Sequence, residues 1–341
     1  MSPTFTLSCL LRTSYENKTK DTVDEMRNYI INILQKMSIT LYSIVFTLGI
    51  IGNGLVIWVA GFRMKKIISA VWFLHLAIAD FLCCASLPLR IAEWSINFSH
   101  YIGFSYCTVN IFLFNINMTA SVLLLTAMSV DRWVSIMWPL WAKNYRTCKV
   151  VRIIAAIIWV LSTLFSGLLY YLYIYHLDEV SDWCLKFDYP NPDVLKRRQT
   201  VRLTRLFTMC VIPFLIIVTS YVTIFFKLRK SKRFQRSQRS FKITTAVISC
   251  FFICWFPYYI WPLTPWYYGP GILLYIVDII VIVLACLNSC INPIIYVFMG
   301  QDFQQSFFRS IPSRLQRALG DHHNYLSSAR EDTRNTRIIV G

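Results

Sequence analysis

The chain has 341 residues, 56% of them hydrophobic and 15% charged, with a formal net charge of +17. Soluble proteins carry about 25% charged residues, so this composition predicts a membrane protein and excludes a secreted disulfide scaffold, a disordered chain and a free cytosolic enzyme. One bilayer span takes about 20 apolar residues, so the length accommodates several helices and leaves little for a soluble domain.

Seven apolar runs of spanning length follow one another along the chain, separated by short polar connections. No linker, low-complexity tract or internal repeat interrupts them, so they predict an all-α membrane protein with one bundle of seven transmembrane helices. The runs cover about Met37–Phe62, Ile67–Ile91, Val109–Val134, Val151–Tyr173, Leu206–Phe226, Ile243–Leu263 and Ile272–Phe298.

Four parts are expected along the chain. Residues 1–36 form an extracellular N-terminal segment, and residues 37–300 form the seven-helix bundle. Residues 301–311 form a short amphipathic helix on the membrane surface, because Phe303 and Phe307 lie four apart and share one helix face. Residues 312–341 form a cytoplasmic tail.

The distribution of lysine and arginine predicts the orientation. The first, third and fifth connections are basic, whereas the connections after spans two and six contain neither residue. Because these residues stay on the cytoplasmic side during insertion, we expect a multi-pass protein of the plasma membrane with its N-terminus outside. The sequons at Asn17 and Asn97 then lie outside and are candidate glycosylation sites. The positive charge lies along a membrane, so it indicates anionic lipid rather than nucleic acid as its partner.

Most of the 11 cysteines lie inside spans, where they act as small apolar residues. Cys107, at the outer start of span three, and Cys184, in the long fourth connection, both face the oxidising side in this orientation. We therefore expect a disulfide between them that tethers the connection to the bundle. Cys9 is left over, either free or paired elsewhere.

Polar residues gather at one depth in the apolar runs. Asp80 lies in the middle of span two, and an ionisable group there is by default a candidate functional residue. The other polar residues at this depth are Asn53, Asn117, Ser121, Asn288, Ser289 and Asn292. Two pairs among them lie four apart and so share a helix face. Their oxygens suit a small hard cation, but a hydrogen-bond network between helices fits the spacing equally well.

Two further features suggest movement. The sequence Asp131-Arg132-Trp133 closes span three at its cytoplasmic edge, and it indicates either an interfacial anchor, which spacing alone favours, or a latch that opens when helices move. Pro213, Pro257 and Pro293 each remove one hydrogen bond within a span and permit a kink.

Taken together, these motifs resemble the rhodopsin-like (class A) G-protein-coupled receptors over about Met37–Leu319. The resemblance rests on independent motifs that occur in order on the right spans: Gly52-Asn53, Leu76–Asp80, Cys107, Asp131-Arg132-Trp133, Trp159, Pro213 with Tyr221, Cys254–Pro257, and Asn292–Tyr296. Trp133 replaces the usual Tyr of its motif, which leaves the working arginine in place.

The resemblance implies roles for these residues. The family's allosteric sodium pocket corresponds to Asp80, Asn117, Ser121, Asn288 and Asn292, and no other cofactor is expected. The signalling switch corresponds to Asp131, Arg132, Tyr221, Trp255, Pro257, Asn292, Pro293 and Tyr296. In such receptors an agonist moves Trp255 and swings span six outward, which releases Arg132 to meet a heterotrimeric G protein. Arrestin and receptor kinases are further implied partners, and no enzymatic activity is implied.

Within the class, the chain resembles the chemoattractant receptors. Leu48–Met64, Leu287–Phe303 and Leu315–Leu319 are similar to formyl peptide receptors, whereas Leu82–Cys84 with Ser86–Pro88 is similar to the C3a anaphylatoxin receptor. The resemblance implies coupling to inhibitory G proteins of the Gi class, in chemotaxis or inflammatory signalling.

The ligand-binding half departs from the formyl peptide pattern. Those receptors carry an Asp where this chain has Asn115, and two arginines four apart where it has Val201 and Arg205. Arg202 is one residue off that pattern and is predicted to face elsewhere by about 100°.

The candidate ligand-binding residues are Arg90, Asn115, Arg205, Trp255 and Asp278. Arg205 suits a carboxylate, and the resemblance gives Asp278 the role of receiving a basic ligand end, so an extracellular peptide with a charged end fits this site. In a second interpretation, Asp278 and Arg90 pair with each other at the membrane edge. A lipid-mediator receptor and a chemosensory (vomeronasal-type) receptor similar to the formyl peptide group remain as alternatives. A retinal protein is excluded by the absence of a Lys on span seven.

Overall fold

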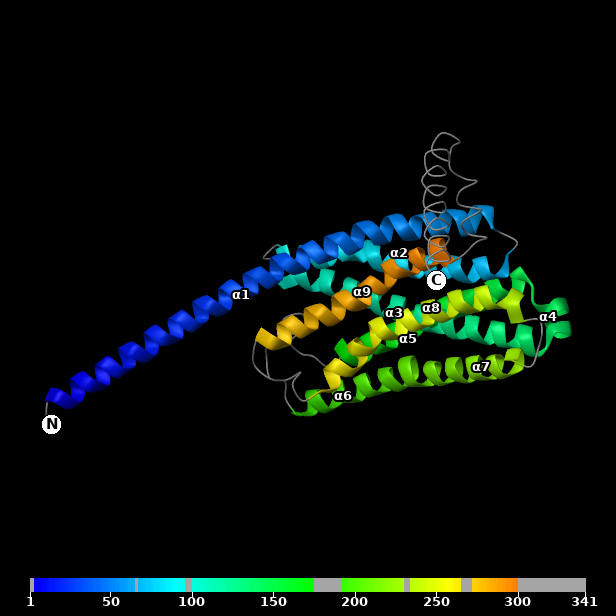
Figure 1. Ribbon diagram of the computed structural model, residues 1–341. Helices are drawn as coiled ribbons and strands as arrows, with labels where there is room; N and C mark the ends of the chain where they lie inside the picture. The colour runs from blue at the N-terminus through cyan, green and yellow to red at the C-terminus, as the bar shows by residue number, and fades with distance from the viewer. Residues whose placement is uncertain are drawn as a thin grey trace, which may run out of the picture.

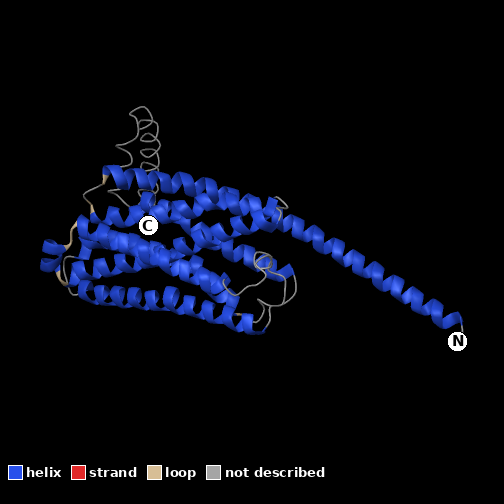
Figure 2. Ribbon diagram, turned by 180° about the vertical axis from the view of Figure 1, so that it is seen from behind, coloured by secondary structure: helices blue, strands red, loops and turns tan. Residues whose placement is uncertain are grey.

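The computed structural model describes residues 3–64, 67–95, 100–174, 192–229, 234–264 and 272–299. All regular structure in these ranges is helical, as Figure 2 shows. Seven helices are long and apolar enough to cross a membrane, which confirms the predicted seven-helix bundle. They lie at Tyr29–Arg63, Ile68–Ala92, Val109–Met137, Cys148–Leu172, Gln199–Lys227, Ile243–Leu263 and Ile276–Tyr296.

The helices run side by side in one bundle (Figure 1). The first four spans belong to α1 (Pro3–Trp58) with the π-turn η1 (Val59–Arg63), α2 (Ile68–Ser95), α3 (His100–Met137) and α5 (Cys148–Ile174). The fifth is built from α6 (Pro192–Leu206), the π-turn η3 (Phe207–Val211) and α7 (Ile212–Arg229). The last two are α8 (Phe234–Ile260), which ends in the 3₁₀ turn η4 (Trp261–Leu263), and α9 (Ile272–Met299). The short helix α4 (Pro139–Tyr145) lies at the end of the bundle opposite the start of α1 (Figure 1).

Helix α1 begins much earlier than the predicted span. It is continuous from Pro3 to Trp58, so the expected extracellular segment 1–36 is helical from residue 3, and its first half extends beyond the bundle (Figure 1). The sequence contains neither Pro nor Gly between Pro3 and Gly49, so no residue type that interrupts a helix separates the segment from the span.

Several predictions fall outside the part of the chain that the structure describes. These are Asn97, Cys184, the surface helix 301–311 and the tail 312–341. Asn17 and Cys107 lie in α1 and α3, at positions where only the helix backbone is described.

The burial pattern is that of a bundle in lipid. The largest fully buried side chains, such as Trp72, Trp255 and Tyr296, face the centre, where α3 packs against α2, α5 and α7. The outward face of α5 exposes more than half of Ile153 and Ile157. Apolar surface of this extent would promote aggregation in water, whereas in a bilayer it faces the acyl chains.

Two prolines free backbone carbonyls that neighbouring helices use. Pro293 has no N–H for the carbonyl of Ser289, and this carbonyl instead accepts a hydrogen bond from Asn53 Nδ2 at 2.8 Å. Pro213 leaves the Met209 carbonyl in the π-turn η3, and that carbonyl accepts the hydroxyl of Tyr259 at 3.3 Å. These two candidate hinge positions are therefore tied to α1 and α8.

Candidate functional site

The end of the fifth span that is predicted to face outside, called the outer end here, carries two arginines that face the bundle. Arg205 is half-buried, and its Nη1 donates a hydrogen bond to the Tyr258 hydroxyl of α8 at 3.0 Å. Its guanidinium carbon also lies 5.8 Å from the centre of the Tyr258 ring, within the range of a cation–π interaction. Tyr258 was not predicted as a site residue.

The prediction that Arg202 faces elsewhere is wrong. Its side chain is 9% exposed, and its Nη1 donates to the Pro262 carbonyl in η4 at 3.1 Å. The physical reason is the spacing from Arg205: three residues correspond to about 300°, which leaves the two side chains only about 60° apart on one helix face. Both arginines therefore contact the outer end of the sixth span.

Asp278 reaches the same end of the sixth span from α9. It is 8% exposed, and its carboxylate accepts a hydrogen bond from the indole N–H of Trp261 at 2.9 Å. Tyr258 and Trp261 are only three residues apart in the chain. Arg205 of the fifth span and Asp278 of α9 therefore both bond to the same outer end of the sixth span.

Two other predicted ligand residues point to different partners. The guanidinium of Arg90 lies 5.8 Å from the centre of the Tyr42 ring in α1, so Arg90 contacts the α1 side of the bundle. Asn115 is buried, and its Nδ2 donates to the Ile111 carbonyl of its own helix at 2.8 Å. Its Oδ1 has no hydrogen-bond partner among the described residues.

Trp255 lies beneath Tyr258 in an aromatic cluster. It is fully buried, its ring centre lies 5.1 Å from that of Phe114 in α3, and its plane is perpendicular to the Tyr258 ring at 5.6 Å. Phe114 also contacts Tyr258 at 5.3 Å. Tyr258 therefore connects the Arg205 contact to Trp255 and to α3.

Three of the polar residues at mid-depth donate hydrogen bonds to Asp80. Its carboxylate is fully buried and accepts hydrogen bonds from Ser289 at 2.8 Å, from Asn292 at 2.8 Å and from Asn117 at 3.4 Å. Sequence spacing left a cation site and a hydrogen-bond network open, and these contacts form a network between α2, α3 and α9.

The same cluster retains oxygens that suit a cation. Among the described residues, Asn117 Oδ1 and Asn292 Oδ1, on two of the side chains that donate to Asp80, have no hydrogen-bond partner, and neither do the buried Ser121 Oγ and Asn288 Oδ1 of the same two helices. Unsatisfied buried oxygens beside a buried carboxylate are costly. Carboxylate, hydroxyl and amide oxygens are the ligands that a small hard cation prefers, so the donor set fits one.

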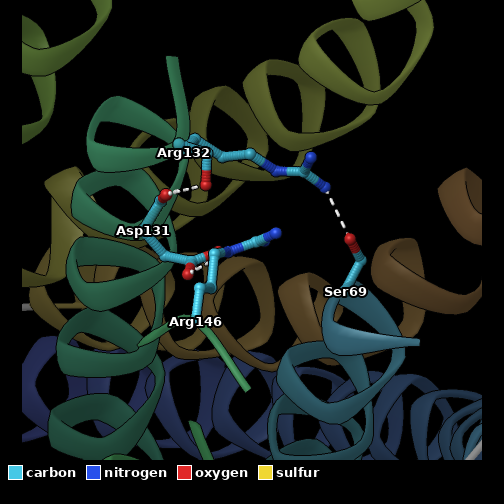
Figure 3. Close-up of polar contacts among 5 residues, drawn as sticks. Ser69, Asp131, Arg132 and Arg146 are labelled. Carbon is cyan, nitrogen blue, oxygen red and sulfur yellow. Dashed lines mark hydrogen bonds and ion pairs between the residues drawn. The ribbon is translucent and has the colours of Figure 1, made fainter. Parts of the chain in front are cut away.

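At the opposite end, Asp131 forms its ion pair with the loop that follows α3. Both carboxylate oxygens accept hydrogen bonds from Arg146, at 2.7 Å from Nε and at 2.6 Å from Nη2 (Figure 3). Arg132 has a different partner, and its Nη2 donates to the Ser69 hydroxyl of α2 at 2.7 Å (Figure 3). The Asp-Arg motif is thus divided between two partners, and sequence reasoning identified neither Ser69 nor Arg146 as a partner.

The remaining predicted switch residues lie at different depths of the bundle. The Tyr221 hydroxyl of α7 faces the hydroxyls of Ser129, Thr244 and Thr245. Tyr296 of α9 is 1% exposed and stacks at 4.5 Å on Phe73 of α2. Pro257 lies inside α8, below the Arg205 and Asp278 contacts.

Comparison with known proteins gives one family. A model described as the 7 transmembrane receptor (rhodopsin family) matches residues 52–296. Chemerin-like receptor 1 of Sus scrofa is 37% identical over 308 residues, which cover 85% of this chain and 84% of that receptor. The C3a anaphylatoxin chemotactic receptor of Danio rerio is 34% identical over 316 residues, covering 92% and 86%. Formyl peptide receptor-related sequence 1 of Mus musculus is 33% identical over 313 residues, covering 87% and 89%.

Proposed function

The chain belongs to the rhodopsin family of seven-transmembrane receptors and is a G-protein-coupled receptor of the chemoattractant type; on this premise we propose that its ligand is an extracellular peptide with a charged end and that it activates inhibitory G proteins of the Gi class. Its relatives have names that refer to chemerin, C3a and formyl peptides. The chain is about equally identical to all three, so sequence identity does not favour one of these ligands. The sixth-span contacts of Arg205 and Asp278 carry the ligand part of the proposal.

These contacts offer a ligand two opposite charges, on the fifth span and on α9, that both bond to the outer end of the sixth span. A peptide carboxylate that binds Arg205 bidentately competes with the Tyr258 hydroxyl. A basic ligand group that binds Asp278 competes with the Trp261 indole. Either exchange changes what holds the outer end of α8, and Tyr258 passes the change to Trp255.

Pro257 makes this end of α8 able to move. Its ring removes one hydrogen bond from the helix, between the ligand contacts and the long inner part of α8. We propose that binding tilts α8 about Pro257, that its inner end moves outward, and that Arg132 then meets the G protein. Arrestin and receptor kinases belong to the same proposal, with Ser327, Ser328, Thr333 and Thr336 of the tail as phosphate acceptors.

A sodium ion at Asp80 is part of the proposed resting state. The side chains of Asp80, Asn117, Ser121, Asn288 and Asn292 would hold it. The ion would neutralise the buried carboxylate and favour the arrangement in which α2, α3 and α9 converge. We also propose that the receptor lies in the plasma membrane with the start of α1 outside.

The test is G-protein dissociation in cells that express the receptor, with formylated peptides, peptides with a C-terminal Arg, and lipid mediators as ligands. We expect a peptide acid to activate the wild type, the corresponding amide to be much weaker, and Arg205→Ala to lose about 100-fold in potency, as expected for a buried charge-assisted pair. Lys196→Ala is the matched control, because Lys196 is an exposed cation on the same helix.

Two results would contradict the proposal. If the peptide acid and the corresponding amide are equally potent on the wild type, Arg205 does not bind a ligand carboxylate. Activation by a lipid mediator alone, independent of Arg205, would replace the peptide with a lipid. Arg132→Ala should abolish the response while leaving surface expression intact.

A further inference from the structure

The switch arginine has no acidic partner on the helix that is proposed to move. The sequence from Lys227 to Leu263 contains neither Asp nor Glu, so no carboxylate of the sixth span or of the connection before it is available to Arg132. The restraint on Arg132 must therefore come from other elements.

Asp131 is already committed elsewhere. Its two carboxylate oxygens each receive a hydrogen bond from Arg146, in the two-point geometry that makes arginine–carboxylate pairs strong. Arg146 follows directly on α4, and its backbone N–H donates to the Ala142 carbonyl at 3.0 Å. The position of α4 thus determines whether Asp131 is occupied.

Arg132 donates instead to a neutral group. Its Nη2 lies 2.7 Å from the Ser69 hydroxyl, which belongs to the first turns of α2. In Figure 3 the guanidinium of Arg132 extends toward Ser69, while Arg146 lies at the Asp131 carboxylate. Arg146, and not Arg132, is therefore the hydrogen-bond partner of the Asp131 carboxylate.

We propose that Ser69 is the positioning residue that holds Arg132 at rest, and that Arg146 weakens this restraint by keeping Asp131 away from Arg132. This inference rests on the proposed function, because it concerns the same switch. It predicts opposite signs for two single substitutions at the same end of the bundle.

The experiment measures ligand-free nucleotide exchange on purified Gi by the full-length receptor in membranes, normalised to receptor amount. Ser69→Ala removes a hydrogen bond to a charged group, and we expect basal exchange to rise about three- to tenfold. A misfolded receptor would lower exchange, so a rise cannot come from loss of folding. Ser69→Thr keeps the hydroxyl and should stay near wild type.

A matched control is available one turn beyond the motif. Ser135 donates its hydroxyl to the Asp131 carbonyl oxygen at 2.6 Å, so it bonds the helix backbone and not the switch. Ser135→Ala should leave basal exchange unchanged.

Arg146→Gln should have the opposite effect. It frees the Asp131 carboxylate for Arg132, and basal exchange should fall about threefold or more. The connection between α3 and α5 that carries Arg146 is on the side proposed to bind the G protein, so a second readout without G protein is needed. Energy transfer between fluorophores in the connection between α7 and α8 and in the tail should report a smaller outward displacement of α8. Lys149→Gln removes an exposed cation of the same segment and should change neither readout.

The double variant separates positioning from structure. With Asp131 freed by Arg146→Gln, Arg132 has a carboxylate, so Ser69→Ala should raise basal exchange far less than it does alone. Additive effects would overturn the inference, as would an unchanged basal exchange in Ser69→Ala. If this inference fails but an agonist still activates the receptor and Arg132→Ala abolishes that response, the proposed function stands. If no variant supports nucleotide exchange with any ligand, both the proposed function and this inference are wrong.

Discussion

Two buried carboxylates, Asp278 toward the outer end of α9 and Asp80 at mid-depth in α2, are held in different ways. Asp80 is fully buried and accepts hydrogen bonds from short side chains of α3 and α9. Asp278 accepts the indole of Trp261, which lies beyond Pro257 at the end of the sixth span. Asp80 therefore connects three helices, whereas Asp278 is bonded to the sixth span, the element that a ligand is proposed to move.

The arginines extend the same contrast. Arg202 and Arg205 both donate to the outer end of the sixth span, where a ligand group can replace the acceptor. At the inner end, Arg146 occupies a carboxylate of the neighbouring helix, and both of its contacts are charge-assisted. The outer contacts can thus be exchanged for a ligand group, whereas the inner Arg146–Asp131 pair is held by two charge-assisted hydrogen bonds.

Replacing each carboxylate by its amide should give the largest difference between the two regions. We expect sodium to weaken binding of the activating peptide about tenfold or more in the wild type, within the range of allosteric coupling. Asp80→Asn removes the only charge of the proposed ion site, so sodium should then have no effect. Asp278→Asn should keep the sodium effect while it lowers potency for peptides with a basic end.

The measurement is competition binding in sodium and in an organic cation at equal ionic strength. Equal sodium dependence in wild type and Asp80→Asn would remove the ion from the resting state. Loss of that dependence in Asp278→Asn would mean that the two regions are not separate.

The close packing of the inner helices predicts a second difference, in stability. A Cβ atom at Gly49 would clash with Cys84 Sγ and lie 3.5 Å from Cys290 Sγ, where α1, α2 and α9 meet. Gly49→Ala should therefore destabilise the receptor by about 1–3 kcal/mol, the usual cost of overpacking. At Gly167 on α5 an added Cβ meets nothing within 4 Å, so Gly167→Ala should be neutral or slightly stabilising.

Thermal unfolding in detergent, followed by thiol-independent fluorescence, measures this difference. Cys84→Ala removes the sulfur that clashes and should restore most of the stability of Gly49→Ala. A Gly49→Ala receptor as stable as the wild type would show that α1 adjusts freely against α2.

The sequence predicted the bundle and the Asp80 cluster because both follow from regular spacing. Apolar runs of spanning length define the helices, and residues four apart at a common depth, such as Asn288 and Asn292, share a helix face. The early start of α1 does not follow from the apolar run that begins at Met37, because the polar residues before it continue the helix with no Pro or Gly after Pro3 to interrupt it. The Asp131–Arg146 pair was missed because it joins residues across a turn, where periodicity gives no direction. The Arg132–Ser69 contact depends on how α2 and α3 cross, which a single sequence does not contain.

The smallest expected effect concerns the Tyr258 hydroxyl in the outer region. Tyr258→Phe removes the acceptor of the Arg205 hydrogen bond but keeps the ring that contacts Trp255 and Phe114. A ligand carboxylate then binds Arg205 without displacing a partner, so potency of the peptide acid should rise about three- to tenfold, the value of one such hydrogen bond. Potency of the amide should not change, because the amide makes no ion pair. A lower potency of the acid would mean that the hydroxyl orients Arg205 for the ligand instead of competing with it, and the exchange of partners proposed for the outer region would then be wrong while the inner region remained as described.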